Sequence, residues 1–420
     1  MKIQQVLFAP GKSAFFFDDQ RAIKSHAIHD GFIYKGRPRT PGFRRIRMAG
    51  ESVSVMLFLD DGQVALGDCA AVQYSGVGGR DPLFLANTYL PFLRRKVAPL
   101  LEGQKITSFR SMTNWMESLR FRDNRLHTAI RYGLSQAILD ACAKARRMLP
   151  CEIIAEEYNL PLIPCRVPIF GQSGDNRYEN VDKMILKEVD ALPHGLINDI
   201  PDKLGRRGEK LRAYIRWIRQ RIRQLRPHPS YRPALHLDVY GTIGIAFEGN
   251  VGKIADYIAS LESDAGEFPL YIEGPVDMEE KSRQMETLLQ IRTILRRKGS
   301  TVKIVADEWC NTLQDIREFT DAAVCDMIQI KTPDLGGLQD TVEAVLYCRA
   351  HGIEAYQGGT CNETDISARA CVQVAIATRP HRLLAKPGMG FDEGFSIVNN
   401  EMERTLAILK QRKPAPPKTT

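Results

Sequence analysis

Residues 302–331 begin with Val302-Lys303-Ile304-Val305-Ala306-Asp307 and end with Met327-Ile328-Gln329-Ile330-Lys331. Both runs are short and apolar, and both end in a charged residue. The segment between them is long enough for a helix. A strand, a helix and a second strand in this order are typical of a parallel sheet with crossover helices. This stretch therefore indicates an α/β fold.

The same alternation extends in both directions from about residue 165. The further apolar runs are Val167 to Phe170, Leu235 to Val239, Leu270 to Ile272 and Ile353 to Tyr356. Helical segments lie between them, for example Val251 to Glu262, Glu279 to Arg297 and Thr341 to Ala350. The spacing suits an eight-stranded barrel. A doubly wound sheet is the alternative, but no Gly-x-Gly-x-x-Gly follows a strand to support a dinucleotide fold.

The first part of the chain has a different pattern. Apolar residues alternate between Val53 and Leu59, Asp61-Gly62 can form a hairpin turn, and residues 64–69 return as a second strand. The periodicity of residues 126–145 predicts a helix with a buried face. The glycine-rich loop of residues 73–80 lacks the lysine and hydroxyl of a phosphate-binding loop and is interpreted as a mobile flap. We therefore predict an N-terminal α+β capping domain over residues 1–160, a TIM-like barrel over residues 161–410, and a disordered basic tail over residues 411–420.

Composition excludes several classes of protein. The chain has 420 residues, of which 44% are hydrophobic and 26% are charged, so it can form a large core. Its mean hydropathy is -0.26, and no stretch approaches the apolar length of a membrane-spanning helix. The first residues do not resemble a secretory signal. The nine cysteines include no Cys-x-x-Cys pair, which favours free thiols in a reducing compartment. We expect a cytoplasmic protein without a membrane partner.

The net charge of +8 raises the alternative of a nucleic-acid-binding protein. Much of the basic charge falls in residues 206–226, where apolar residues recur at helical spacing. This pattern is typical of an amphipathic helix with a solvated basic face. The basic face lacks aromatic interleaving, and no nucleic-acid-binding module is recognised. We therefore expect no nucleic-acid partner; retention on heparin or DNA that is lost only at high salt would support the alternative.

Acidic residues end three successive predicted strands. His236-Leu237-Asp238 ends the first, Tyr271-Ile272-Glu273 the second, and Ile304-Val305-Ala306-Asp307 the third. The carboxyl ends of barrel strands converge on the active-site mouth. Three carboxylates that meet there need a cation between them, and oxygen ligands favour Mg²⁺ over zinc. One such acid alone is more often a helix cap, but three in succession predict a metal site.

The next strand ends in a base, Lys331, which shares a strand face with Gln329. A lysine inside a barrel mouth is either paired with a carboxylate or deprotonated, and with a lowered pKa it would act as a general base. His194, in Leu192-Pro193-His194, is a second candidate acid or base, although a single histidine there is often structural.

The chain resembles the methylaspartate ammonia-lyase family of the enolase superfamily over nearly its whole length. The motifs that carry the resemblance are Phe17-Asp18-Asp19-Gln20-Arg21, Gly67-Asp68-Cys69-Ala70-Ala71-Val72-Gln73-Tyr74-Ser75-Gly76, Gln172-Ser173-Gly174-Asp175, Asp238-Val239-Tyr240-Gly241-Thr242, Ala306-Asp307-Glu308-Trp309-Cys310-Asn311-Thr312, Gln329-Ile330-Lys331-Thr332-Pro333-Asp334, and Gly359-Thr360-Cys361-Asn362-Glu363-Thr364. The resemblance implies a (β/α)7β barrel with an N-terminal capping domain. It also implies reversible elimination of ammonia from L-threo-3-methylaspartate to give mesaconate, in glutamate degradation.

The resemblance also implies roles for particular residues. Asp238, Glu273 and Asp307 match the family's magnesium ligands. Lys331 matches its principal base, which takes the C3 proton, and His194 matches its second acid or base. The residues that match its substrate-binding positions are Gln73, Gln172, Gln329, Thr360 and Cys361. The family further implies potassium as an activator and a homodimer. Independently of the resemblance, Cys361 has no histidine–acid pair beside it in sequence, which favours substrate packing over a nucleophilic role.

One alternative to this reaction remains open from the sequence. Another enolase-superfamily enzyme, such as a dehydratase or racemase of a related carboxylic acid, would use the same metal and the same lysine. The motifs around Gln172 and Thr360 favour the lyase over that alternative.

Overall fold

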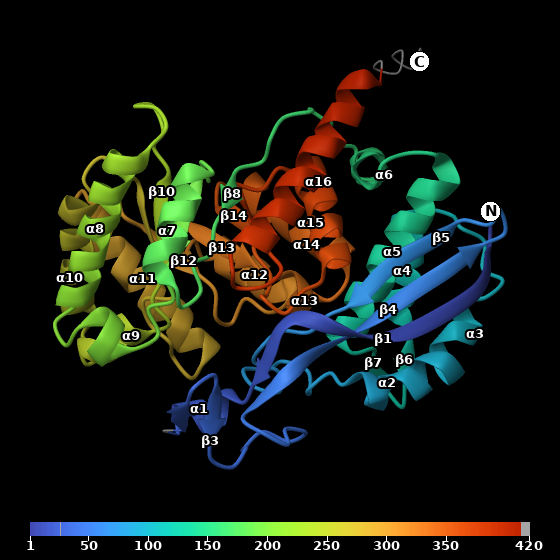
Figure 1. The fold of residues 1–420 in the computed structure, drawn as a ribbon, viewed down its shortest axis with the longest axis horizontal. Coiled ribbons are helices and arrows are strands. Elements are labelled where there is room, and N and C mark those ends of the chain that lie inside the picture. Colours follow the sequence, from blue (N-terminus) through green and yellow to red (C-terminus); the bar gives the residue numbers. More distant parts are fainter. Residues whose placement is uncertain (26, 413–420) are drawn as a thin grey trace.

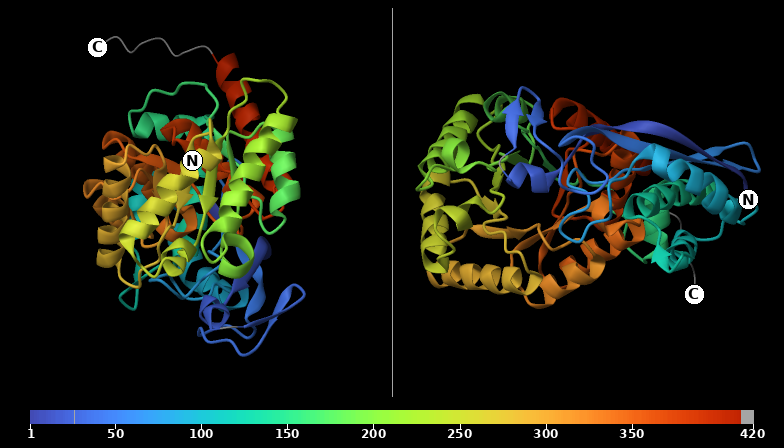
Figure 2. Two further views of the ribbon diagram at one scale, coloured as in Figure 1. Left: turned by 90° about the vertical axis from the view of Figure 1, so that its left-hand side faces the viewer. Right: turned by 90° about the horizontal axis from the view of Figure 1, so that it is seen from below.

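The chain forms a closed barrel beside an N-terminal sheet domain (Figures 1 and 2). The computed structural model describes residues 1–25 and 27–412. In these residues, no helix combines the length and the hydrophobicity needed to cross a bilayer. The predicted tail lies outside the described residues from residue 413 onward.

All neighbouring strands of the barrel are parallel, and they close in the order β10-β11-β12-β13-β14-β15-β8-β9. The strands are β8 (Ile169–Phe170), β9 (Ala191–His194), β10 (Ala234–Asp238), β11 (Leu270–Glu273), β12 (Lys303–Ala306), β13 (Met327–Ile330), β14 (Glu354–Gln357) and β15 (Arg382–Leu384). The predicted parallel barrel is therefore confirmed, and the doubly wound sheet is not what forms.

Helices surround the barrel as an outer ring, which is seen end-on in the right view of Figure 2. They are α7 (Arg177–Leu186), α8 (Glu209–Leu225), α10 (Val251–Ala265), α11 (Lys281–Arg297), α12 (Leu313–Asp321), α14 (Leu338–Ala350), α15 (Asp365–Thr378) and α16 (Asp392–Gln411). Shorter segments at the strand ends are η2 (Ile200–Leu204), α9 (Thr242–Ala246) and α13 (Thr332–Leu335). Their apolar faces pack on the outside of the strands, while a separate small cluster that includes Phe170, Tyr271 and Tyr356 fills the barrel interior.

The basic helix α8 is the segment that raised the nucleic-acid alternative. Acidic side chains on the adjoining elements neutralise much of its charge: Arg216 Nη1 lies 2.8 Å from Asp264 Oδ1, and Arg221 Nη2 lies 2.6 Å from Asp182 Oδ2. Its buried residues are Leu211, Tyr214, Ile215, Ile218 and Ile222, which recur at helical spacing. The predicted amphipathic helix is confirmed, and its arginines hold neighbouring helices as well as facing solvent.

The N-terminal domain is built on an antiparallel sheet in the order β1-β4-β5, with β1 (Ile3–Asp18), β4 (Arg47–Leu59) and β5 (Val64–Cys69). The helices beside it are α2 (Ala86–Phe92), η1 (Leu93–Val97), α3 (Ala98–Leu101), α4 (Phe109–Ser118), α5 (Thr128–Arg146) and α6 (Pro150–Glu157). The smaller elements are α1 (Gln20–Lys24), β2 (Ile28–Asp30), β3 (Ile33–Lys35), β6 (Arg120–Phe121) and β7 (Asn124–Arg125). The predicted hairpin and the helix over residues 126–145 correspond to β4–β5 and α5.

Helix α5 lies directly on strand β5. A Cβ atom added at Gly67 would sit 2.1 Å from the carbonyl oxygen of Gly133, so only glycine allows this approach. The close packing fixes the residues that follow β5, which extend toward the barrel. The last elements of this domain end at Glu157 and the first barrel strand begins at Ile169; the limit at residue 160 itself stays a prediction.

Candidate active site

Three buried carboxylates stand at the carboxyl ends of adjacent barrel strands. Asp238 and Glu273 are the last residues of β10 and β11 and pair in register, and Asp307 directly follows β12. Burial raises the pKa of Asp238 well above its usual range, and the charge of Asp307 raises it further. Burial and the charges of Asp238 and Asp307 do the same for Glu273. An excess of buried negative charge with hard oxygen donors fits a divalent cation such as Mg²⁺.

Among the described residues, one group of possible metal ligands converges closely: His194, Asp238 and Glu273, whose ligand atoms all lie within 4.8 Å of one another. His194 Nε2 is 3.5 Å from Asp238 Oδ2. Two of the three predicted ligands therefore meet here together with the predicted second acid or base. The third predicted ligand, Asp307, is instead paired with Lys331, so the complete ligand set stays a prediction.

Lys331 follows β13 and faces Asp307, with its Nζ 2.7 Å from Asp307 Oδ1. Burial alone would lower the pKa of Lys331, but the charges of Asp307, Glu308 and Asp334 together outweigh burial, and the pKa is raised. The predicted lowering of the Lys331 pKa is therefore wrong for the protein without a metal ion. Of the two alternatives that the sequence allowed, pairing with a carboxylate is the one that the structure shows. Arg80 is the charge that opposes this rise.

His194 ends β9, and the strand order places β9 four positions from β13 in both directions around the barrel. The strands that carry the two predicted acid–base groups are therefore diametrically opposed. Burial lowers the pKa of His194 to about 4, and the charge of Lys331 contributes. His194 is thus a neutral imidazole near neutral pH and can accept a proton.

One cavity contains all the predicted site residues except Glu273, which is fully buried beneath it. From the barrel it is lined by Gln172, His194, Asp238, Asp307, Gln329, Lys331, Thr360 and Cys361, and from the N-terminal domain by Gln73. The N-terminal domain closes one side of the cavity because the chain after β5 reaches across it. Burial raises the pKa of the Cys361 thiol to about 12, which keeps it protonated and excludes a thiolate nucleophile near neutral pH.

Gln73 connects the two domains at the cavity. Its Nε2 donates to Asp18 Oδ2 at 2.6 Å, and its Oε1 accepts from Cys361 Sγ at 3.4 Å. Asp18 is held in turn by Arg47, whose Nε donates to Asp18 Oδ1 at 2.7 Å. The amide of Gln73 is therefore oriented by groups from both domains.

Arg80 ends the glycine-rich segment of residues 73–80, and its side chain is only 5% exposed. Its Nε donates to Asp334 Oδ2 at 2.9 Å, and its Nη2 lies 3.3 Å from Glu308 Oε2. Both partners belong to the barrel, so this ion-pair cluster ties the glycine-rich segment over the mouth. The segment's predicted mobility stays a prediction.

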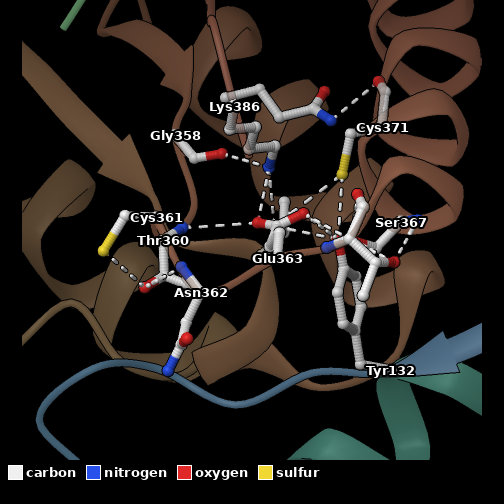
Figure 3. A network of polar contacts seen from close by, with 12 residues as sticks. Tyr132, Gly358, Thr360, Cys361, Asn362, Glu363, Ser367, Cys371 and Lys386 are labelled. Carbon is white, nitrogen blue, oxygen red and sulfur yellow. Dashed lines mark hydrogen bonds and ion pairs between the residues drawn. The ribbon is translucent and has the colours of Figure 1, made fainter. Parts of the chain in front are cut away.

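A fully buried ion pair between Lys386 and Glu363 holds the loop that carries Thr360 and Cys361 (Figure 3). Lys386 Nζ lies 2.8 Å from Glu363 Oε1 and 2.5 Å from the carbonyl oxygen of Gly358. The hydroxyl of Tyr132, on α5, donates to Glu363 Oε2 at 2.8 Å. The pair therefore joins the loop, β15 and the N-terminal domain.

Replacing this lysine with a neutral side chain is expected to destabilise the protein strongly. Lys386→Met leaves the Glu363 carboxylate buried without its cation, which should cost about 3–5 kcal/mol in the free energy of unfolding. Urea unfolding measures the change. In the control, Lys386→Met combined with Glu363→Gln, no charge is left and at least half of the loss should return. A single variant within 1 kcal/mol of the unaltered protein would contradict the argument.

Two supporting groups were missed by sequence reasoning. His236 lies inside β10 and contacts Glu273, with 2.8 Å between His236 Nε2 and Glu273 Oε2. The Tyr356 hydroxyl donates to the other oxygen, Glu273 Oε1, at 2.7 Å. Both oxygens of Glu273 are thus oriented from within the barrel. The only available signal for His236 was its two-residue spacing from Asp238, which places both side chains on one strand face.

Other missed residues line the cavity or support it. Glu308 directly follows Asp307, and Arg80 ends the glycine-rich segment of residues 73–80. Leu384 is the last residue of the short strand β15, and Lys386 lies two residues after it. Residues close to them in the sequence were predicted to belong to the site, but no local sequence pattern indicated which side chains these residues contact. Those partners come from segments far away in the chain.

Comparisons with known proteins agree with this architecture. Family models match the C-terminal part of methylaspartate ammonia-lyase over residues 161–411 and its N-terminal part over residues 1–159. The methylaspartate ammonia-lyase of Citrobacter amalonaticus is 61% identical over 412 residues, which cover 98% of this chain and 100% of the relative. That of Clostridium tetanomorphum is 53% identical over 413 residues, with 98% and 100% covered.

Solved structures give the same result. The Citrobacter amalonaticus enzyme containing (2S,3S)-3-methylaspartic acid superposes with a TM-score of 0.97 at 61% identity, covering 98% of this chain and 100% of that one. A magnesium complex of the Clostridium tetanomorphum enzyme gives 0.94 at 53% identity, with 98% and 100% covered. The Bacillus subtilis L-Ala-D/L-Glu epimerase, at 17% identity and a TM-score of 0.63 over 94% and 91% of the two chains, shares the fold alone. The chain therefore belongs to the methylaspartate ammonia-lyase family of carbon–nitrogen lyases, which has the enolase-superfamily fold.

Proposed function

We propose that this protein eliminates ammonia reversibly from L-threo-3-methylaspartate to give mesaconate, with Mg²⁺ held by Asp238, Glu273 and Asp307. The observation that carries the proposal is the pairing of Lys331 with a cluster of buried carboxylates in one cavity. Structures of two relatives support the choice of substrate and metal: one contains 3-methylaspartic acid, and another is a magnesium complex. Bound at the carboxylates, Mg²⁺ would stabilise the negative charge that develops on the substrate carboxylate next to C3.

Lys331 takes the proton from C3 in this proposal. The electron pair of the C3–H bond forms the C2–C3 double bond, and the pair of the C2–N bond leaves with ammonia. Lys331 must enter the step as a neutral amine, and burial favours that form once Asp307 no longer supplies its full charge. His194, on the opposed strand, acts on the other epimer at C3 or in the slower syn elimination.

Amide and backbone groups would hold the substrate without adding charge to the cavity. Gln172 Nε2 already donates to the carbonyl oxygen of Gly388 at 2.7 Å, which orients its side chain. Gln329 Oε1 is buried and has no hydrogen-bond partner in the described residues. Within the same residues, the backbone N–H of Cys361 has no backbone or side-chain acceptor, and we assign it to a substrate carboxylate. Fixing these groups in advance reduces the entropy lost in the reaction.

The proposal is tested by mixing the purified protein with threo-3-methylaspartate, Mg²⁺ and K⁺ and following the ultraviolet absorbance of the conjugated product. We expect absorbance that rises with time and stops when EDTA is added. The same assay with Na⁺ in place of K⁺ tests potassium as activator, and size-exclusion chromatography tests the homodimer. A flat trace from folded protein would remove this reaction and favour a dehydratase or racemase of a related acid.

The role of His194 has its own test. His194→Ala is expected to lower turnover of the epimer with the opposite configuration at C3 by about 10²-fold, the scale of one acid–base group, and to change threo turnover much less. Parallel assays on the two epimers measure the ratio. Equal losses on both would show that His194 serves the cavity generally and has no epimer-specific role.

A further inference from the structure

A second cavity lies at the opposite end of the barrel from the carboxylates. Its lining includes the first residues of β10 and β15, Ala234 and Arg382, and the residues just before β8, β9 and β11. It has a volume of about 590 Å³. We call it the floor basin and define it by its basic residues Arg166, Arg232, Arg349, Arg379, His381 and Arg382.

The floor basin has more positive charge than the protein balances. Arg382 is only 3% exposed, yet no carboxylate lies within ion-pair distance of it in the described part of the chain. Its guanidinium carbon lies 3.9 Å from the centre of the Tyr271 ring. Arg232 and Arg379 form no ion pair or side-chain hydrogen bond with any described residue. Three acids lie nearby. Asp190 accepts from the backbone of Ile169, Glu403 pairs with Arg166 at 3.2 Å, and Glu354 is neutralised by Lys303 and lies 3.7 Å from His381.

Arg382 also connects the floor basin to the predicted metal site. Its Nη1 lies 2.9 Å from His236 Nδ1, and His236 Nε2 lies 2.8 Å from Glu273 Oε2. A guanidinium can only donate, so Nδ1 of His236 must accept and Nε2 must carry the proton that is donated to Glu273. Two hydrogen bonds therefore run through the barrel interior from the basin to a carboxylate of the active site.

We propose that the floor basin binds a multiply charged oxyanion of the phosphate class, and that its occupancy tightens Mg²⁺ binding at the carboxylates. Arginine forks match the oxygens of such anions, and the basin offers several of them around one buried guanidinium. An anion there offsets the positive charge of Arg382, which lies on the far side of His236 from Glu273. Less positive charge behind Glu273 favours a cation in front of it. The second part rests on the proposed metal site; the first does not.

Binding is tested first on the metal-free protein, without substrate, by calorimetric titration with inorganic phosphate and with pyrophosphate. The variant Arg232→Ala/Arg379→Ala removes two unpaired basin charges. The control Arg206→Ala/Arg297→Ala removes the same net charge from other surfaces. We expect saturable binding to the unaltered protein and the control, and at least tenfold weaker binding to the basin variant. No saturable binding, or equal binding by all three proteins, would overturn the proposal.

The connection is tested by titrating Mg²⁺ calorimetrically with and without saturating inorganic phosphate, at matched free Mg²⁺. We expect at least threefold tighter Mg²⁺ binding with phosphate in the unaltered protein and no change in the basin variant. Unchanged Mg²⁺ affinity in the unaltered protein would remove the connection between the sites. If Mg²⁺ did not bind at the carboxylates at all, the proposed function would fail, but the phosphate titration would still show whether the floor basin binds an oxyanion.

Discussion

Lys331→Ala is expected to lower kcat for threo-3-methylaspartate by about 10³-fold or more, and to abolish exchange of the C3 proton with solvent. The loss follows because Lys331 is the one lysine among the described residues that line this cavity, and a positioned base accounts for about 10²–10⁴-fold. Product absorbance measures the first quantity, and nuclear magnetic resonance in D₂O measures the second.

The Mg²⁺ affinity of Lys331→Ala shows whether the variant has lost only its base or whether the whole site is disrupted. Lys331 Nζ competes for Asp307 Oδ1, so removing it should leave Mg²⁺ affinity equal or higher. Retained proton exchange with the threo substrate would remove Lys331 from the role assigned to it. Lost Mg²⁺ binding together with lost activity would instead indicate that the lysine maintains the site.

Asp238→Asn is expected to weaken Mg²⁺ binding by about 100-fold and to lower kcat/KM by roughly 10²–10³-fold, the scale of losing one main electrostatic group. The same change should stabilise the metal-free protein and raise its Tm by about 2 °C or more. The reason is that Asp238 is buried beside Asp307 and Glu273, and their charges repel one another.

Calorimetry measures the affinity, and thermal unfolding in EDTA measures the Tm. Asp256→Asn is a suitable control because its carboxylate is 62% exposed and, among the described residues, pairs with Lys298 alone. The control should leave both quantities unchanged. An Asp238 variant with normal Mg²⁺ affinity would exclude this residue as a ligand, and a lowered Tm would show that the carboxylate is not strained without a cation.

Much of the barrel could be predicted because its strands are apolar runs with a length and spacing that local pattern reveals. Two strands were not predicted as runs. The first, β9, contains Pro193, which a strand pattern normally excludes, and β15 is only three residues long and begins with Arg382. Closure of the barrel, not local propensity, makes these segments strands.

The candidate site divides in the same way. Asp238, Glu273 and Asp307 could be predicted together because strand ends converge wherever a parallel barrel forms. The Lys386–Glu363 pair and the Arg382–His236–Glu273 connection could not. Each joins segments that no local pattern relates, and each depends on which interior positions face one another after closure. The raised pKa of Lys331 belongs to this second class, since only the folded geometry supplies Asp307 as its partner.

The cavity takes its acid–base and carboxylate groups from the barrel and one wall, with Gln73, from the N-terminal domain. Mutations in the N-terminal domain can therefore change which substrates fit the cavity without altering the groups that carry out the reaction. Exchange of the segment after β5 between family members would present new walls to the same reactive centre, provided that Arg80 keeps its barrel partners Asp334 and Glu308. In protein engineering, the segment after β5 is therefore the region to exchange, while the residues at the barrel strand ends are kept unchanged.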